Sequence, residues 1–268
     1  MTQQLGFAGQ GLAEMPSVRY TSSPLRYPGG KSWQAKTIRQ HIPAGIDRIV
    51  SPFFGGGWVE LERAANGIRV FGADRFEALV NFWQQVLFQP REVAKRVKFF
   101  YPLDKWKFKD LQDRLRAGDD DDLWSAALFF TLNRTSFSGT TLSGGFSPGH
   151  DRFTLRHIES LENFVAPGIE VVCADWLNTM TEHSSLFAYL DPPYWIGRNL
   201  YGDKSERDDE FDHAELADYL RHRRGWLLSY NDCPEVRRLY EGFRVLEPEW
   251  LTGMGVDKMK RELLILSD

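Results

Sequence analysis

An alternation of strand-like and helix-like segments near the amino end most constrains the fold of this chain. A short apolar run at 48–52 is followed by three glycines at 55–57 and by a helical pattern at 58–65. A second apolar run at 68–73 then ends on Asp74. Parallel strands need a crossover connection, usually a helix, so this order predicts the opening of a parallel α/β sheet.

Later segments continue the pattern and interrupt it once. From about 76 to 132 the pattern is helical, and the stretch 133–151 is rich in Ser, Thr and Gly, which favours a loop or an irregular hairpin. The remaining expected elements are helices at 31–42, 213–220 and 234–240, and strands at 169–174, 186–190, 226–230 and 263–266.

These elements predict a domain organisation. We expect an α/β sheet domain made of 25–84 and 166–268, interrupted by a helical insert at 85–165 and preceded by a flexible arm at 1–24. No apolar run reaches the length of a membrane span, so none is expected. The two cysteines and six histidines show no metal-ligand spacing, and we expect no metal.

The charges are distributed unevenly along the chain. The net charge is −4, yet residues 91–116 carry nine Lys or Arg side chains against four Asp or Glu, with five aromatic residues among them. Such a mixture is typical of a nucleic-acid contact, and a solvated amphipathic helical region is the alternative. Within this stretch, Lys105, Lys107 and Lys109 are the expected contacts to a nucleic-acid backbone.

The apolar run before Asp191 ends in the sequence Asp191-Pro192-Pro193-Tyr194. A carboxylate and a rigidly held backbone carbonyl can accept both hydrogens of an exocyclic amino group, which exposes the nitrogen lone pair to an electrophilic methyl group. Proline stiffens the turn because its φ is fixed, and a tyrosine ring can stack on a flipped base. A plain proline turn at the end of a strand is the alternative.

A lysine follows two glycines in Gly29-Gly30-Lys31. A phosphate-binding loop would need glycine five residues before Gly30, where Leu25 stands, so a nucleoside-triphosphate site is excluded on spacing. Two glycines still let a ligand approach the backbone, and Lys31 can pair with a carboxylate. An ordinary turn before a helix is the alternative.

Glycines and acids follow successive strands at positions that can meet. Gly55, Asp74 and Asp191 each come after a strand, so all three are expected on one edge of the sheet, where open parallel sheets bind ligands. The full dinucleotide fingerprint is absent, because Glu60 stands where its third glycine belongs. We therefore expect a nucleoside cofactor beside an amino-activating turn.

Taken in order, these motifs resemble those of the Dam-type N6-adenine DNA methyltransferases of the D12 class, alpha group. Members often carry tryptophan at the position of Tyr27 and alanine at that of Pro28. The resemblance covers nearly the whole chain after residue 24. It is carried by Leu25-Arg26-Tyr27-Pro28-Gly29-Gly30-Lys31, Pro52-Phe53-Phe54-Gly55-Gly56-Gly57, Phe71-Gly72-Ala73-Asp74, Leu132-Asn133-Arg134-Thr135-Ser136-Phe137-Ser138-Gly139, Gly145-Phe146-Ser147-Pro148-Gly149 and Asp191-Pro192-Pro193-Tyr194.

The resemblance implies a Rossmann-like methyltransferase sheet, S-adenosylmethionine as methyl donor, and direct transfer without a covalent enzyme intermediate. Lys31 is expected near the methionine carboxylate, Asp74 at the ribose, and Asp175 with Trp176 at the adenine. Catalysis is assigned to Asp191, Pro192, Pro193 and Tyr194. Cofactor contacts are assigned to Tyr27, Lys31, Pro52, Phe53, Gly55, Gly57, Asp74, Asp175, Trp176 and Asp191. DNA contacts are assigned to Lys105, Lys107, Lys109, Asn133, Arg134 and Ser136.

For Asn133 and Arg134, a structural loop bond and a surface charge are the alternatives.

The expected substrate is adenine flipped out of double-stranded DNA. Two other functions stay open: amino methylation of cytosine N4 or of RNA, and DNA binding without catalysis. Cytosine enzymes usually carry serine in place of Asp191. We also expect a monomer or weak dimer. The expected location is the cytoplasm of a bacterium, in association with the nucleoid, for a protein of bacterial or phage origin. A restriction endonuclease counterpart and the recognition sequence stay open.

Overall fold

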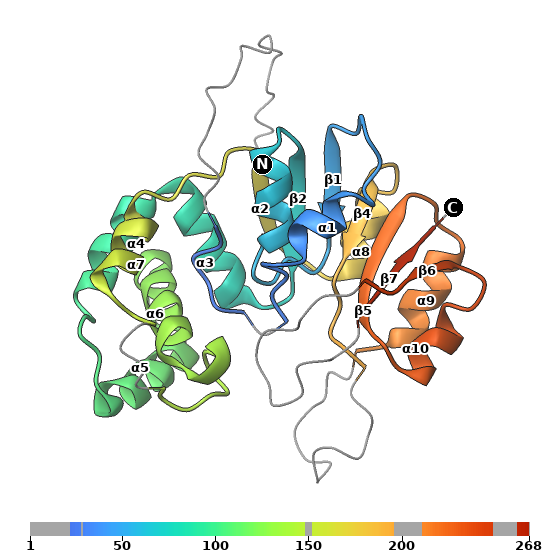
Figure 1. Cartoon of the computed structure of the whole chain (residues 1–268). Coiled ribbons are helices and arrows are strands. Elements are labelled where there is room, and N and C mark those ends of the chain that lie inside the picture. The colour runs from blue at the N-terminus through green and yellow to red at the C-terminus, as the bar shows by residue number, and fades with distance from the viewer. Residues whose placement is uncertain (1–21, 28, 148–151, 196–210, 249–261, 268) are drawn as a thin grey trace, which may run out of the picture.

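A seven-stranded sheet runs through the middle of the molecule (Figure 1). The structure, a computed structural model, describes residues 22–27, 29–147, 152–195, 211–248 and 262–267. The strands are β1 (Arg48–Ser51), β2 (Arg69–Asp74), β3 (Ile169–Cys173), β4 (Phe187–Leu190), β5 (Trp226–Asn231), β6 (Arg244–Leu246) and β7 (Glu262–Leu266).

The strand order is β3-β2-β1-β4-β5-β7-β6. Strands β1 to β5 pair in parallel, and β7 pairs antiparallel with both β5 and β6. In this register Ile49 of β1 lies opposite Val70 of β2 on one side and Phe187 of β4 on the other. The order confirms the expected Rossmann-like sheet, and the reversal between β1 and β4 is the position where such sheets bind ligands.

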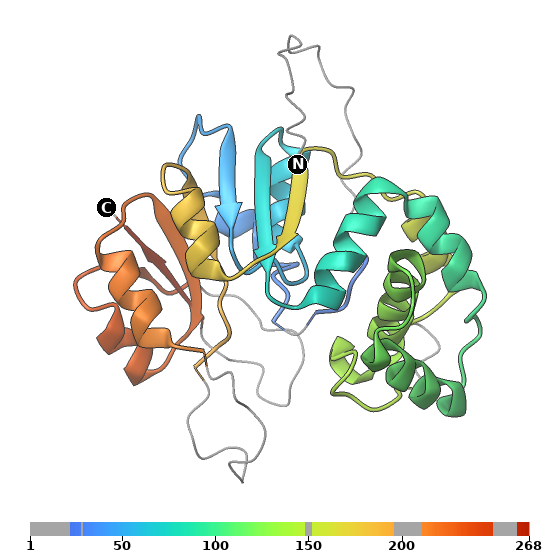
Figure 2. The same cartoon turned by 180° about the vertical axis from the view of Figure 1, so that it is seen from behind.

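Helices cover both faces of the sheet (Figures 1 and 2). Because successive side chains of a strand point to opposite faces, Tyr189 packs with α1 (Ala35–Arg39) and α2 (Trp58–Ala65), while its neighbours Ala188 and Leu190 pack on the other side. That other side is covered by α8 (Trp176–Glu182), α9 (His213–Arg221) and α10 (Pro234–Leu239).

The helical part of the chain packs beside the β3 edge of the sheet, where β3 is the yellow strand of Figure 2. It consists of α3 (Glu77–Phe88), α4 (Pro90–Lys98), α5 (Lys105–Ala117), α6 (Asp122–Thr135), the short 3₁₀ turn η1 (Phe137–Gly139) and α7 (Leu155–Glu162).

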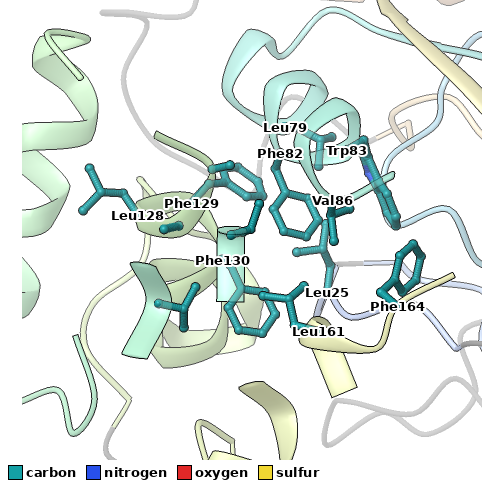
Figure 3. Close-up of a cluster of buried hydrophobic side chains, with 14 of the residues drawn as sticks. Leu25, Leu79, Phe82, Trp83, Val86, Leu128, Phe129, Phe130, Leu161 and Phe164 are labelled. Carbon is teal, nitrogen blue, oxygen red and sulfur yellow. The ribbon is translucent and has the colours of Figure 1, made fainter. Parts of the chain in front are cut away.

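Side chains of α3 and α6 form the centre of this helical core, as Figure 3 shows. Phe82, Phe129 and Phe130 are almost fully buried, and each such side chain contributes about 1.5–3 kcal/mol to folding. Acidic side chains define where α5 and α6 begin: Asp104 accepts a bond from the Lys107 amide, and Asp121 accepts one from Trp124. The core therefore fixes the insert against α3, which in turn packs on β2 and β3.

The expected elements are present with three differences. The helix expected at 31–42 is limited to α1, and α6 continues to Thr135, so the loop expected from 133 begins later. Helices α7 and α8 and strand β6 were not expected as separate elements, because each is short. Most of the arm at 1–24 and Pro28, Pro148 and Gly149 lie outside the described residues. Among the described helices, none has the length and apolar character to cross a bilayer.

Candidate active site

A cavity of about 600 Å³ lies where β1, β2 and β4 end. Its volume is in the range of pockets that hold a nucleoside-sized ligand. The turns that follow these three strands contribute many of its lining residues. Its lining includes Tyr27, Lys31, Pro52, Phe53, Gly55, Gly57, Asp74, Trp176, Asp191, Pro192, Pro193 and Tyr194, and therefore all of the expected catalytic and cofactor-binding residues except Asp175.

The glycine turn after β1 is shaped by close packing. Gly55 and Gly57 have φ of 48° and 64°, a conformation that favours glycine. A Cβ on Gly55 would lie 3.0 Å from Cε1 of Tyr27, and one on Gly57 would lie 2.8 Å from Cε1 of Phe54. The turn thus leaves room for the Tyr27 ring against the backbone at the cavity wall.

Asp74 ends β2 and binds the glycine turn. Its Oδ2 accepts a hydrogen bond from the Gly55 amide at 2.9 Å, and its Oδ1 accepts one from the Phe76 amide at 3.0 Å. Burial raises the pKa of Asp74, while these backbone donors oppose the rise. Each carboxylate oxygen has a second lone pair, so the group can also accept hydrogen bonds from a ligand hydroxyl.

Asp191 is held by a lysine from the first glycine motif. The Lys31 Nζ donates to Asp191 Oδ1 at 2.9 Å, to the Tyr194 hydroxyl at 2.7 Å and to the Gly29 carbonyl at 3.0 Å. Lys31 is 3% exposed. Burial raises the pKa of Asp191, and the charge of Lys31 opposes this rise.

The three donors of Lys31 are directed to groups of this chain. Its expected place near the methionine carboxylate of the cofactor stays a prediction. The sequence shows that a lysine follows the glycines, yet the distance of 160 positions to Asp191 hides the pairing.

Two further carboxyl groups lie close to this centre. Glu60 lines the cavity and accepts a hydrogen bond from Ser51 Oγ at 2.5 Å, and burial raises the pKa of Glu60 to about 7. Glu262 of β7 accepts a hydrogen bond from the Tyr194 hydroxyl at 2.5 Å. Sequence reasoning noted Glu60 only as a missing glycine and did not consider Glu262. An acid on the apolar face of a predicted helix is the signal that would have found Glu60.

The helical insert contributes one wall of the cavity. Gly139, Thr140, Thr141 and Ser143, which follow α6, line it. Gln112 of α5 holds this segment by donating to the carbonyls of Thr141, Leu142 and Gly144, at 2.8, 3.3 and 2.9 Å.

Asn133 joins the insert to the segment before Tyr27. Its Oδ1 accepts from the Arg26 amide at 2.8 Å, and its Nδ2 donates to the Arg26 carbonyl at 2.8 Å and to the Gly139 carbonyl at 2.9 Å. Asn133 is fully buried. The structural alternative therefore describes this residue, and its expected contact with DNA does not fit its position.

Arg134 and Ser136 also differ from expectation. Arg134 is 9% exposed and donates from Nε to the Arg152 carbonyl at 2.7 Å. Burial and the neighbouring charge of Arg26 lower the pKa of Arg134 to about 10. Ser136 is buried, and its Oγ accepts from the Thr141 amide at 2.9 Å. Both residues stabilise the insert where DNA contacts were expected.

The lysines of α5 lie outside the cavity on the surface. Lys105, Lys107 and Lys109 are exposed, as is Trp106, which is 88% accessible. Lys109 pairs with Asp113 at 2.8 Å, and Lys107 lies 3.8 Å from Asp104. This position permits contact with a large polyanion, although exposed ion pairs of this kind are weak.

Of the two adjacent residues Asp175 and Trp176, only Trp176 lines the cavity. Trp176 lines the cavity beside Phe53 and Phe211, with ring centroids 6.5 Å apart for Trp176 and Phe211. Asp175 accepts from the Leu177 amide at 2.8 Å and caps α8, outside the cavity lining. The aromatic wall is suited to a planar ring, whereas the expected cofactor contact of Asp175 is not supported by its position.

Comparison with known proteins identifies related sequences. The family model described as D12 class N6 adenine-specific DNA methyltransferase matches residues 27–254. The DNA N-6-adenine-methyltransferase of Escherichia phage P1 is 28% identical over 253 residues, which cover 86% of this chain and 33% of that protein.

Two other relatives are closer to this chain in length. The type II methyltransferase M.CviBI of Paramecium bursaria Chlorella virus NC1A is 23% identical, covering 82% of this chain and 86% of that protein. The DNA adenine methylase of Serratia marcescens is 26% identical, covering 63% of this chain and 66% of that protein. The chain thus spans about a third of the phage P1 relative and most of the chlorella virus relative.

Proposed function

This chain belongs to the D12 class N6 adenine-specific DNA methyltransferases, and on that basis we propose that it methylates the N6 amino group of adenine in double-stranded DNA. The printed names of the three relatives, all DNA or type II methyltransferases, support this activity. The cavity at the carboxyl ends of β1, β2 and β4 supports it independently.

The family implies a methyl donor, and we assign S-adenosylmethionine to the cavity. The residues fit such a group: Asp74 offers carboxylate oxygens suited to ribose hydroxyls, and the glycine turn after β1 lines the same cavity. Phe53, Trp176 and Phe211 supply apolar surface for a purine. When bound, this donor supplies an electrophilic methyl group on a sulfonium.

Asp191 and Pro192 activate the target base. The Asp191 carboxylate accepts one hydrogen of the adenine amino group, and the Pro192 carbonyl accepts the other. Both bonds draw the nitrogen toward a tetrahedral shape and make its lone pair available. The fixed φ of Pro192 and Pro193 keeps the carbonyl at a constant angle. Positioning of this kind accounts for most of the rate when the donor itself is reactive.

Lys31 and Tyr194 complete the base site. A buried carboxylate is a good acceptor only while it is ionised, and the nearby Lys31 charge favours that form. The Tyr194 ring lies at the cavity and serves as the surface on which the flipped base stacks. Lys105, Lys107 and Lys109 on α5 bind the DNA backbone without reading its sequence. A restriction endonuclease counterpart, the oligomeric state and the cellular location stay predictions.

One observation carries the proposal most strongly: Asp191 of the Asp-Pro-Pro-Tyr turn lines the same cavity as the glycine turn and Asp74. The test is incubation with methyl-labelled donor and unmethylated duplex DNA, followed by digestion to nucleosides. Label in N6-methyldeoxyadenosine is the expected result. Label only in N4-methyldeoxycytidine, label only when RNA is supplied, or DNA binding without any label would each overturn it.

A further inference from the structure

Glu262 is a buried acid from a distant part of the chain. It begins β7, pairs in register with Asn231 of β5, and is 5% exposed. Its Oε1 lies 2.5 Å from the Tyr194 hydroxyl and 3.7 Å from Lys31 Nζ. Lys31 therefore lies between two carboxylates, those of Asp191 and Glu262.

The hydrogen-bond directions in this cluster follow from the donors available. A tyrosine hydroxyl has one hydrogen, which Tyr194 donates to Glu262. The hydroxyl oxygen then accepts from Lys31, whose other donors reach Asp191 and Gly29. Glu262 thus holds the hydroxyl end of the Tyr194 ring. It also attracts the Lys31 ammonium, which weakens the attraction between Lys31 and Asp191.

The sharing of Lys31 affects the basicity of Asp191. A lysine paired with Asp191 alone would bind that carboxylate more tightly and make it a weaker acceptor for an amino group. Glu262 opposes this effect by its own attraction for Lys31 and by its repulsion of the Asp191 charge. Hydrogen bonds to charged groups are among the strong ones, so the arrangement also limits the movement of Tyr194.

We propose that Glu262 is a positioning residue for base methylation, holding the Tyr194 ring and tuning the acceptor strength of Asp191 through Lys31. This inference rests on the proposed function, because it assigns Asp191 and Tyr194 to the target base. No sequence motif marks Glu262, and its role comes only from the place of β7 beside β5.

A pH profile distinguishes this role from simple structural support. Within the part of the chain that the structure describes, the charged and titratable groups that act on Asp191 include Lys31, Glu60, Glu262 and the three tyrosines Tyr27, Tyr189 and Tyr194. The negative charge of Glu262 raises the pKa of Asp191. Its removal therefore moves protonation of Asp191, and with it the acid limb of the rate profile, to lower pH.

The experiment compares Glu262→Gln with the wild type and with Glu62→Gln. Gln keeps the size and an acceptor for Tyr194 but removes the charge. Glu62 is a matched control, because it is a buried acid paired with Arg63 and lies outside the cavity lining. Single-turnover methylation is measured from pH 5 to 9, with DNA and cofactor affinity and thermal stability measured on the same samples.

Glu262→Gln is expected to lower the single-turnover rate about tenfold, the change one weakened charged hydrogen bond brings. Its acid limb is expected at lower pH, with both affinities unchanged and with Glu62→Gln keeping the wild-type rate and acid limb. The Asp191 carboxyl titration, followed by ¹³C NMR in cofactor-free protein, is expected to shift to lower pH as well. An unchanged rate, or a lower rate with an unmoved acid limb and titration, overturns the inference.

A second variant keeps the test independent of how Glu262→Gln folds. Tyr194→Phe retains the ring and removes the hydroxyl between Glu262 and Lys31, and it is expected to lower the rate by a similar factor. An unchanged rate in this variant also overturns the inference. An inactive wild-type protein overturns the proposed function, whereas an active wild type with unchanged variants overturns the role of Glu262 alone.

Discussion

Lys31 compensates the charge of the Asp191 carboxylate, which burial alone would tend to protonate. Its Nζ lies 2.9 Å from Asp191 Oδ1, and it is 3% exposed. Removing one partner of such a pair leaves the other charge uncompensated, so Lys31→Met is expected to lower the free energy of unfolding by about 3 kcal/mol. Urea denaturation at pH 7 measures this, with the exposed Lys36→Met as a control expected within about 0.5 kcal/mol of wild type. Equal stability of the two variants would contradict the pairing.

Glu60 makes stability depend on pH. Its pKa is raised from 4.5 to about 7 in the folded protein, chiefly by burial. The folded state therefore holds its proton at pH values where the unfolded chain releases it, so this contribution is full below pH 4.5 and is lost as pH rises through 7. At about 1.4 kcal/mol for each unit of pKa, the loss in unfolding free energy is on the order of 3 kcal/mol.

The variant Glu60→Gln removes this dependence. We expect the fall in unfolding free energy between pH 5 and pH 8 to be smaller in Glu60→Gln than in the wild type. The difference between the two proteins cancels the contributions of the other titrating groups. Parallel stability curves over this range would show that Glu60 titrates normally.

At the scale of elements, Gln112 connects α5 to the cavity wall. Its Nε2 donates to three carbonyls between Thr141 and Gly144. Gln112→Ala leaves these groups without that donor, and we expect faster hydrogen exchange in peptides covering 139–147 and a methylation rate lowered several-fold. Gln85→Ala is the control, because that side chain bonds only to groups of α3 and its neighbouring Gln89 in the described contacts. Unchanged exchange in both variants would show that the wall is held by other contacts.

The sequence predicted the strands of the sheet better than it predicted which distant segments lie beside each other. Parallel strands at 48–52, 68–73 and 186–190 could be found because apolar runs ending in glycine or acid have a local signature. The register of β7 against β5, which places Glu262 beside Tyr194, depends on contacts between distant segments. Local patterns do not contain that information.

The same limit applies to two of the site residues, Asn133 and Arg134. Asn133 and Arg134 are polar residues at the end of an apolar helix, which suggested exposure. In the structure Asn133 binds backbone groups of Arg26, which lies 107 positions earlier in the sequence. Arg134 donates to the carbonyl of Arg152, which lies 18 positions later. A buried polar side chain that satisfies distant backbone groups looks identical, in sequence, to one that faces a ligand.

At the scale of the whole molecule, the proposed function assigns the chemistry to the sheet and the affinity for DNA to the insert. The basic helix α5 lies at the opposite end of the molecule from α10 (Figure 1). We expect Lys107→Gln with Lys109→Gln to weaken DNA binding and to reduce the slope of log Kd against log salt by about 2, one for each lost phosphate contact. Arg238→Gln on α10, 75% exposed, is the control expected to leave the slope unchanged. An unaltered slope in the double variant would place DNA on another surface.

In the proposed function, the Asp191 carboxylate accepts a hydrogen bond from the amino group that receives the methyl. The most direct measurement is the single-turnover methylation rate of Asp191→Ala beside that of the wild type, with DNA affinity determined for both. We predict a loss of about a thousandfold or more in rate, as expected when a preorganised acceptor is removed, with DNA affinity retained. A variant that binds DNA and still methylates adenine at the wild-type rate would contradict the account.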